Sequence, residues 1–451
     1  MTHPSAQDLP TLVIGAGPVG LAAAAHLLER GLAPLVVEAG PRGAEAVRSW
    51  GHVRLFSGWG ELVDPAAARL LEVSGWLAPP ADGYPTGGEW AERYLQPLAD
   101  ALGDRVRYGT TVTGLARRGR DRVVDSGRAE QPFTVHLRSA DGTQTRLQAQ
   151  SVVDASGTVS MPNPIGADGY PADGEAQHAD QVSYRIPDLT TAQGRQRYAG
   201  RRTAVVGSGH SALTALLGLA DLARTAPGTS VVWVLRRGAV DAAFGGGAAD
   251  ELPARGALGL AARDAVAQGQ VEVVRGFRTE SLHREGATLV IRSDDGRRID
   301  GVDEVVALTG FRPDHSVAAE LRLSLDERLG AARGLAPLID PNAHSCGSVA
   351  PHGAAELAQG EEGFFIVGMK SYGRAPTFLA MTGYEQVRSV AAALAGDHEA
   401  AARVELTLPE TGVCGGSGLF DDSAAGASAD GGCCTPVSAV IQLGAGQPAH
   451  A

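Results

Sequence analysis

The sequence is poor in cysteine, aromatic residues and basic charge, and each scarcity excludes a class of protein. Only four of the 451 residues are cysteines, and none precedes Cys346. A disulfide framework for the core is therefore excluded, and so is a redox-active cysteine pair in the first three quarters of the chain. Aromatic residues make up 5% of the chain, and the formal net charge is -12. This acidic balance argues against a nucleic-acid-binding surface.

Long apolar runs are also missing. The longest, near residues 213–222, is too short to cross a bilayer. Residues 1–10 are polar and lead directly into an apolar strand pattern, which is not the pattern of a secretory signal peptide. The composition is that of an ordinary α/β protein of two or three domains. We therefore expect a cytoplasmic protein without nucleic-acid or membrane partners, and the sequence leaves its oligomeric state open.

The first informative pattern is a strand, a glycine turn and a helix at the N-terminus. The strand is expected at residues 11–14 and the helix at residues 18–30. Between them, Gly15 permits a tight turn and Gly17 lets a pyrophosphate approach the backbone at the helix N-terminus. Gly20 allows the helix to pack closely on the strand. This spacing is the dinucleotide-binding pattern G-x-G-x-x-G.

Glu38 makes the pattern specific. It ends the next strand, expected at residues 35–37, and its carboxylate can accept hydrogen bonds from both ribose hydroxyls of an adenosine. Glycine is common in surface loops, so the glycines alone would be weak evidence. Together with Glu38 they predict a dinucleotide site, which we interpret as the site for FAD.

A second unit of the same kind carries GSGHSA at residues 207–212. Its strand is followed by the turn and then by a helix, as in the first unit. Ala212 stands in place of the third glycine, and this substitution is compatible with a slightly wider gap between helix and strand. The residues expected to contact the second nucleotide in this turn are Gly207, Gly209, Ser211 and Ala212.

The following strand, expected at residues 231–235, ends in Arg236 and Arg237 instead of an acid. An acid would repel the 2′-phosphate of NADPH, whereas guanidinium groups bind phosphate through paired hydrogen bonds. The pair therefore favours NADPH over NADH. The alternative is that both are ordinary solvated residues in an arginine-rich chain.

These two units predict an α/β fold with two Rossmann-like dinucleotide-binding domains. Antiparallel strands are expected between them at residues 133–137 and 145–148, joined by an Asp-Gly turn. The NADPH domain is expected to be inserted into the FAD domain, and a flexible tail follows. The expected parts are residues 1–165 and 331–404 for the FAD domain, 166–330 for the NADPH domain, and 405–451 for the cysteine-containing tail.

Two glycine motifs in this order, the first followed by an acid and the second by arginines, resemble the flavin-containing monooxygenases. Residues 152–157 (VVDASG) and 305–310 (VVALTG) are similar to the family's apolar strands that end in Ala-Thr-Gly and cross between domains. Residues 161–164 (MPNP) are also typical. The resemblance covers residues 10 to about 395. It implies an enzyme that reduces FAD with NADPH, forms a flavin C4a-hydroperoxide with O2, and oxygenates a soft nucleophile as its small-molecule substrate.

The family's histidine motif at the domain crossing is matched only in part. Ala172 replaces its aromatic residue and Tyr184 comes late. We therefore expect His178 to be an exposed loop residue. Residues 248–256 are expected to form a loop over the nicotinamide, where Arg255 either clamps a phosphate or substrate or is a plain surface residue.

Residues 364–374 (FFIVGMKSYGR) resemble the late strand and glycine turn, at Gly368, that return the chain to the flavin. Many relatives place an aspartate after this glycine, where this chain has Met369. Asp340 or backbone groups would then serve the ribityl chain. Lys370 is the only lysine in the sequence. An ammonium beside the flavin would stabilise its reduced anion, which makes Lys370 a candidate catalytic residue, with chance survival of a single lysine as the alternative.

The tail contains Cys414, Cys433 and Cys434. Three thiolates suit a soft ion such as arsenite, mercury or Cu(I), and the pattern is similar to tails of flavin-monooxygenase-like proteins associated with arsenic resistance. An unselected or redox-sensitive cysteine pair is the alternative.

Two other functions remain open on sequence grounds. One is an NADPH-dependent flavoprotein reductase or diaphorase that acts on a metalloid or quinone. The other is a metalloid-binding protein with a vestigial flavin fold. A flavin–disulfide reductase is disfavoured, because its redox-active cysteine pair would have to lie before residue 346.

Overall fold

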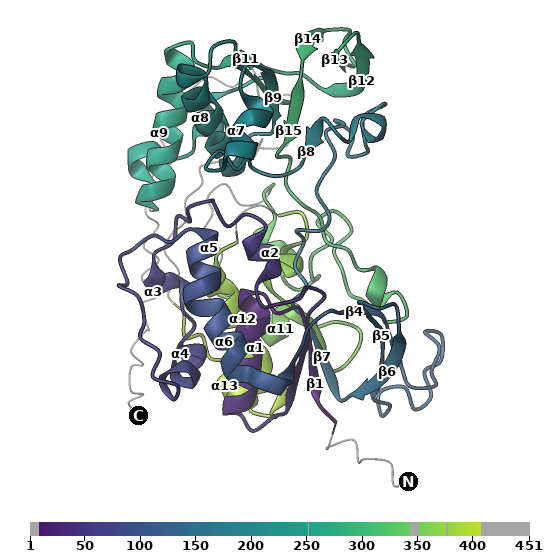
Figure 1. Ribbon diagram of the computed structural model, residues 1–451. Coiled ribbons are helices and arrows are strands. Elements are labelled where there is room, and N and C mark those ends of the chain that lie inside the picture. The colour runs from purple at the N-terminus through teal and green to yellow at the C-terminus, as the bar shows by residue number, and fades with distance from the viewer. Residues whose placement is uncertain (1–8, 251, 343–350, 376–377, 407–451) are drawn as a thin grey trace, which may run out of the picture.

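A computed structural model describes residues 9–250, 252–342, 351–375 and 378–406. The chain forms two lobes, each built on a five-stranded parallel sheet, and the chain passes between them more than once (Figure 1). The expected fold class, two Rossmann-like domains with one inserted into the other, is confirmed. No helix in the described ranges is both long and apolar enough to cross a membrane.

The first lobe, the lower one in Figure 1, contains both ends of the described chain. Its parallel sheet has the order β16-β7-β1-β2-β3, with strands β1 (Thr11–Ile14), β2 (Pro34–Val37), β3 (Val106–Arg107), β7 (Ser151–Asp154) and β16 (Phe364–Ile366). An antiparallel sheet is formed by β4 (Thr110–Arg117), β5 (Phe133–Ser139) and β6 (Gln144–Ala149). The helices are α1 (Pro18–Glu29), α2 (Glu45–Arg48), α3 (Trp59–Leu62), α4 (Pro65–Glu72), α5 (Gly87–Trp90), α6 (Gln96–Leu102), α10 (Ala336–Ile339), α11 (Ala354–Leu357), α12 (Ala380–Leu394) and α13 (His398–Ala402).

The second lobe repeats this plan. Its parallel sheet has the order β11-β10-β9-β15-β8, with strands β8 (Val182–Ser183), β9 (Arg202–Val206), β10 (Ser230–Val234), β11 (Glu272–Val274) and β15 (Glu304–Ala307). Its antiparallel sheet is formed by β12 (Thr279–Glu285), β13 (Thr288–Ser293) and β14 (Arg298–Val302). The helices are α7 (Ala192–Tyr198), α8 (His210–Thr225) and α9 (Pro253–Ala267). Along the chain, a three-stranded meander comes between β3 and β7 in the first lobe and between β11 and β15 in the second.

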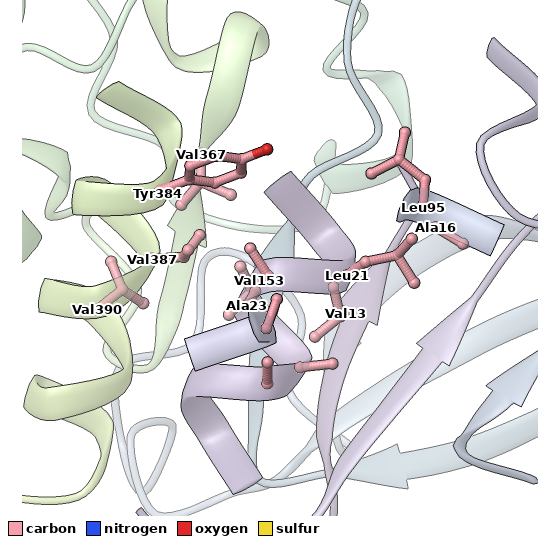
Figure 2. Close-up of a cluster of buried hydrophobic side chains, with 14 of the residues drawn as sticks. Val13, Ala16, Leu21, Ala23, Leu95, Val153, Val367, Tyr384, Val387 and Val390 are labelled. Carbon is pink, nitrogen blue, oxygen red and sulfur yellow. The ribbon is translucent and has the colours of Figure 1, made fainter. Parts of the chain in front are cut away.

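The core of the first lobe lies between its parallel sheet and helices α1 and α12. Figure 2 shows Val13 and Val153 of the sheet close to Leu21 on α1, with Val387 on α12 on the other side of that helix. Small residues bring the two helices together, because a Cβ on Gly383 would lie 2.5 Å from a methyl carbon of Val19. Burial of these aliphatic side chains is the main force that holds the strand–helix layers together.

The prediction of a loop over residues 248–256 is wrong for residues 253–256. They contain the start of α9, which begins at Pro253, a residue favoured in the first helical turn. The helix packs directly on a glycine-rich backbone. A Cβ on Gly256 would lie 2.1 Å from the carbonyl oxygen of Gly247, and one on Gly259 would lie 1.9 Å from that of Phe244.

A buried charge cluster ties the meander of the first lobe to the strand β16. The Glu361 carboxylate accepts hydrogen bonds from Nε of Arg117 at 3.0 Å and from Nε of Arg128 at 2.8 Å. It also accepts the backbone N–H of Arg322 at 3.1 Å. Burial raises the pKa of Glu361, but the hydrogen bonds from both arginines outweigh it and the net shift is downward.

We expect Glu361→Gln to lower the free energy of unfolding by about 3–5 kcal/mol at neutral pH, because it leaves two buried guanidinium groups without their anion. A group with a lowered pKa stabilises above its unfolded value, here 4.5, and loses this effect as the pH falls through its folded pKa. The deficit should therefore be constant at neutral pH and shrink in acid. Denaturant unfolding of Glu362→Gln, an exposed neighbour, is the control. Equal stability of both variants would contradict the prediction.

Candidate functional site

The first glycine turn is held in place by close backbone contacts. Gly15 has a φ of +97°, and a Cβ there would lie 2.9 Å from the carbonyl oxygen of Ala155, just beyond β7. A Cβ on Gly20 would lie 2.0 Å from the carbonyl oxygen of Gly15. Both positions therefore require glycine, and α1 starts directly against the end of β1.

The N-terminus of α1 is open. Its N-cap is Gly17, no side chain caps the helix, and its first turn has no acid. A Cβ on Gly17 would meet no heavy atom within 4 Å. Free N–H groups, the positive end of the helix dipole and open space together suit a diphosphate.

Glu38 lies beside this turn. One carboxylate oxygen accepts the N–H of Ala16 and the other accepts the N–H of Gly40, each at 2.7 Å. These bonds fix the carboxylate, while each oxygen keeps a lone pair for a ribose hydroxyl. The residues of the first unit thus fit the ADP part of FAD.

The second turn has the same construction. Gly207 has a φ of +134°, and a Cβ there would lie 2.2 Å from the carbonyl oxygen of Leu308, just beyond β15. Gly209 is the N-cap of α8, which has no side-chain cap and no acid in its first turn. A Cβ on Gly209 would meet nothing within 4 Å, and Ala212 is fully buried where the third glycine was replaced. Ser211 follows on the exposed side of the helix.

The register of the strands corrects the comparison of Glu38 with the two arginines. Val37 pairs with the residue before Gly15, and Val234 pairs with the residue before Gly207. The position of Glu38 is therefore taken by Leu235, which is buried, and Arg236 comes one residue later. Arg236 is exposed, and Nη1 donates to the carbonyl oxygen of Ala167 at 3.3 Å. Arg237, two positions after Leu235, is half-buried.

Gly368 brings the end of β16 against the first turn of α1. It has a φ of +68°, and a Cβ there would lie 3.3 Å from a methyl carbon of Val19. Its N–H donates to Oε1 of Gln386 on α12 at 2.7 Å. The structure therefore places the late glycine turn next to the helix that would hold the FAD diphosphate.

Lys370 is fully buried in this turn, and its charge is already paired. Nζ donates to Oδ2 of Asp154 at 2.7 Å and to Oγ of Ser156 at 3.0 Å. Asp154 ends β7, so the ion pair joins the ends of the neighbouring strands β7 and β16. Ser156 Cα lies 3.2 Å from the position that a Cβ on Gly15 would take, so the Lys370–Asp154 ion pair lies next to the glycine turn.

Asp340 is occupied elsewhere. Its carboxylate accepts hydrogen bonds from Arg328 at 2.5 Å and from the backbone N–H of Asn342 at 2.9 Å. The N–H of Asn342 and the charge of Arg328 lower the pKa of Asp340. A role for Asp340 toward a ribityl chain thus has no support in these contacts.

Arg255 does not point into an open loop. It lies on α9, buried, and its Nε and Nη2 donate to both oxygens of Asp250 at 2.8–3.0 Å. Burial and the Arg255 charge lower the pKa of His210, the first residue of α8. Phe56 of the first lobe packs edge-on against His210, with ring centroids 5.6 Å apart. Sequence patterns missed this contact between the lobes, because Phe56 belongs to a loop without a motif.

The segments after β7 and β15 cross antiparallel between the lobes and are joined by Asn163. The N–H of Asn163 donates to the carbonyl oxygen of Gly310 at 2.9 Å, and its Nδ2 donates to that of Thr309 at 3.1 Å. Thr309 Oγ1 donates back to the carbonyl oxygen of Asn163 at 2.6 Å. Asn163 of the MPNP segment thus holds the two crossing segments together.

In the segment of the partial family motif, the buried polar side chain is Glu175 and not His178. His178 ends a short 3-10 turn, whereas Glu175 is buried and accepts the backbone N–H groups of Ile165 and Ala172. Tyr184 donates to the same carboxylate. Within the described residues no three His, Cys, Asp or Glu side chains could hold a metal ion. The predicted soft-ion ligands Cys414, Cys433 and Cys434 lie outside the described residues.

Comparisons with known proteins agree with this geometry. A family model described as pyridine nucleotide-disulphide oxidoreductase matches residues 12–332. No curated protein matches the chain significantly in sequence. FAD and NADPH fit the two dinucleotide sites.

Solved structures with the same fold include both reductases and monooxygenases. The bacillithiol disulfide reductase of Bacillus cereus has a TM-score of 0.63 and 21% identity, covering 86% of this chain and 99% of its own. The FAD-bound cadaverine monooxygenase of desferrioxamine biosynthesis from Erwinia amylovora has a TM-score of 0.59 and 16% identity, covering 89% and 98%. Ornithine hydroxylase from Pseudomonas aeruginosa has a TM-score of 0.56 and 15% identity, covering 86% and 99%.

We expect Arg236→Gln to weaken NADPH binding by roughly tenfold to a hundredfold, the worth of a charge-assisted hydrogen bond to a phosphate. NADH lacks the 2′-phosphate, so its affinity should not change and serves as the internal control. Titrations of the FAD-loaded protein with both coenzymes measure the difference. An equal loss for NADH and NADPH would contradict a phosphate contact.

We expect Lys370→Met to lower the free energy of unfolding by about 3–5 kcal/mol, because it leaves Asp154 buried without a counter-ion. The double variant Lys370→Met/Asp154→Asn should recover most of this loss, since neither charge is then present. Denaturant unfolding of both variants is the measurement. A single variant as stable as the wild type, but with a shifted flavin reduction potential, would instead assign Lys370 to the flavin.

Proposed function

Because this chain belongs to the pyridine nucleotide-disulphide oxidoreductase family, we propose that it is an NADPH-dependent FAD monooxygenase that oxygenates a soft nucleophile. Family membership makes it an FAD-dependent oxidoreductase. The observation that carries the narrower proposal is the position of its cysteines. None precedes Cys346, so the two nucleotide-binding units contain no dithiol that could pass electrons from a flavin to a disulfide.

The residues of the two glycine turns hold the coenzymes. The open N–H groups at the start of α1 bind the FAD diphosphate, and Glu38 binds the adenosine ribose. The start of α8 binds the NADPH diphosphate, and Arg236 and Arg237 bind its 2′-phosphate. When bound, the flavin accepts a hydride from NADPH and supplies the oxygen chemistry.

The other residues position and shield. Gly368 and Lys370, with the latter paired to Asp154, keep the β16 turn against the first turn of α1. Phe56 packs edge-on against His210 at the start of α8, where its ring would limit the entry of water. Burial and the charge of Arg255 lower the pKa of His210, which favours its neutral form.

The proposed reaction converts NADPH, H⁺, O2 and substrate to NADP⁺, water and the oxygenated substrate. We expect a substrate to raise NADPH oxidation with equal consumption of O2 and without release of H2O2. An oxygen electrode and a peroxide assay, with arsenite, methylated arsenicals, thiols and amines as the substrate panel, measure this. Release of one H2O2 for each NADPH oxidised, with every compound in the panel, would contradict the proposal.

A reductase is the second candidate, and the likeness to the bacillithiol disulfide reductase favours it. Its electrons would pass to a metalloid or a quinone instead of to O2. NADPH oxidation that continues under anaerobic conditions with such an acceptor would select the reductase, whereas a monooxygenase stops without O2.

A trivalent arsenical is the specific soft nucleophile that the tail cysteines favour. Replacing Cys414, Cys433 and Cys434 with serine tests this choice separately. Unchanged arsenite affinity in that variant would remove the tail as a metalloid site and leave the monooxygenase proposal standing.

A further inference from the structure

Arg312 lies where the two segments that join the lobes cross. Its Nε donates to Oδ1 of Asn163 at 2.8 Å, and its Nη2 donates to the carbonyl oxygen of Gly169 at 2.9 Å. Both acceptors are neutral, so these bonds fix the guanidinium without cancelling its charge. Burial and the charge of Arg374 lower the pKa of Arg312 from its usual value.

Arg374 is held next to Arg312 because both segments contact one turn. The N–H of Arg374 donates to the carbonyl oxygen of Leu329 at 2.8 Å. A Cβ on the next residue of that turn, Gly330, would lie 3.7 Å from Cγ of Pro313, the neighbour of Arg312. Arg374 itself is exposed. The segments that carry the two arginines therefore contact one turn, and the charge of Arg374 acts on Arg312. Like charges that lie near each other cost free energy unless an anion offsets them.

No acid of the described chain offsets these charges. Within the described residues, neither Arg312 nor Arg374 forms an ion pair with a carboxylate. The buried Arg255, by contrast, has its own carboxylate partner. Among the described residues, the two arginines therefore have no carboxylate partner.

Two exposed residues adjoin the backbone groups that hold Arg312. The N–H of Arg312 donates to the carbonyl oxygen of Met161, whose side chain is 39% exposed. Tyr170 follows Gly169, the residue that holds the guanidinium, and is 75% exposed. Exposed Met and Tyr beside a cation suit a ligand with an apolar part next to an anionic group.

We propose that Arg312 and Arg374 bind the anionic group of an organic carboxylate or oxyanion, with its apolar part against Met161 and Tyr170. This inference rests on the proposed function, because it assigns the substrate class of that enzyme. Two guanidinium groups can hold one carboxylate or oxyanion in a defined orientation through paired hydrogen bonds.

Direct binding tests the site without turnover. The FAD-loaded enzyme is first saturated with NADP⁺ and then titrated by calorimetry with phenylphosphonate and with inorganic phosphate. We expect phenylphosphonate to bind more tightly than phosphate. Arg374→Gln should weaken both by about tenfold or more, and Arg374→Lys should weaken them less. Tyr170→Ala should weaken phenylphosphonate alone. Arg138→Gln, an exposed residue on β5, is the control.

Arg374→Gln decides the outcome, because Arg312 also supports the crossing segments and its loss can disturb the fold. Unchanged affinity for both probes in Arg374→Gln would overturn the proposal. It would also be overturned if NADP⁺ abolished probe binding and the variant weakened NADP⁺ instead, since the anion would then belong to the coenzyme. Intact, arginine-dependent probe binding in an enzyme that shows no oxygen-coupled turnover would contradict the monooxygenase proposal alone.

Discussion

In both lobes, a glycine turn lies so close to the carbonyl oxygen beyond a neighbouring strand that no side chain fits between them. The Cβ positions of Gly15 and Gly207 fall 2.9 and 2.2 Å from the carbonyl oxygens of Ala155 and Leu308. Each helix starts close to the end of its strand, and its N-terminus keeps free N–H groups that would face a diphosphate. Both coenzyme sites depend on this backbone contact, and the side chains around them adjust affinity and choice.

The strands β7 and β15, whose following residues contact the glycine turns, also lead into the segments that cross between the lobes. Beyond β7 and β15, the chain runs between the lobes and is clasped by Asn163. The two strands differ at their last register position. Asp154 of β7 pairs with Ile14, and Ala307 of β15 pairs with Val206. At this position the first lobe therefore has a buried carboxylate, Asp154, and the second has none. Lys370, from a later segment of the chain, neutralises Asp154.

The sequence predicted the glycine units to within one or two residues at each boundary. The helix expected at residues 18–30 spans Pro18–Glu29, and the strand expected at 231–235 spans Ser230–Val234. The predictions failed where contacts between distant parts of the chain determine the local structure. Arg255, assigned to a loop, lies on α9 because that helix packs on glycine backbone. Leu235, and not Arg236, occupies the position of Glu38, because the register depends on which residues of adjacent strands pair.

By itself, then, the sequence determined the two strand–turn–helix units, the acid beside one and the arginines after the other. Each of these units lies within about 35 consecutive residues, where spacing and backbone preferences act directly. Only the tertiary structure decided the partners of charged groups. Lys370 and Asp154 are 216 positions apart, and Arg312 and Arg374 meet through a turn that belongs to neither segment. Such pairs form only after the sheets have closed, because burial brings together side chains that no local spacing relates.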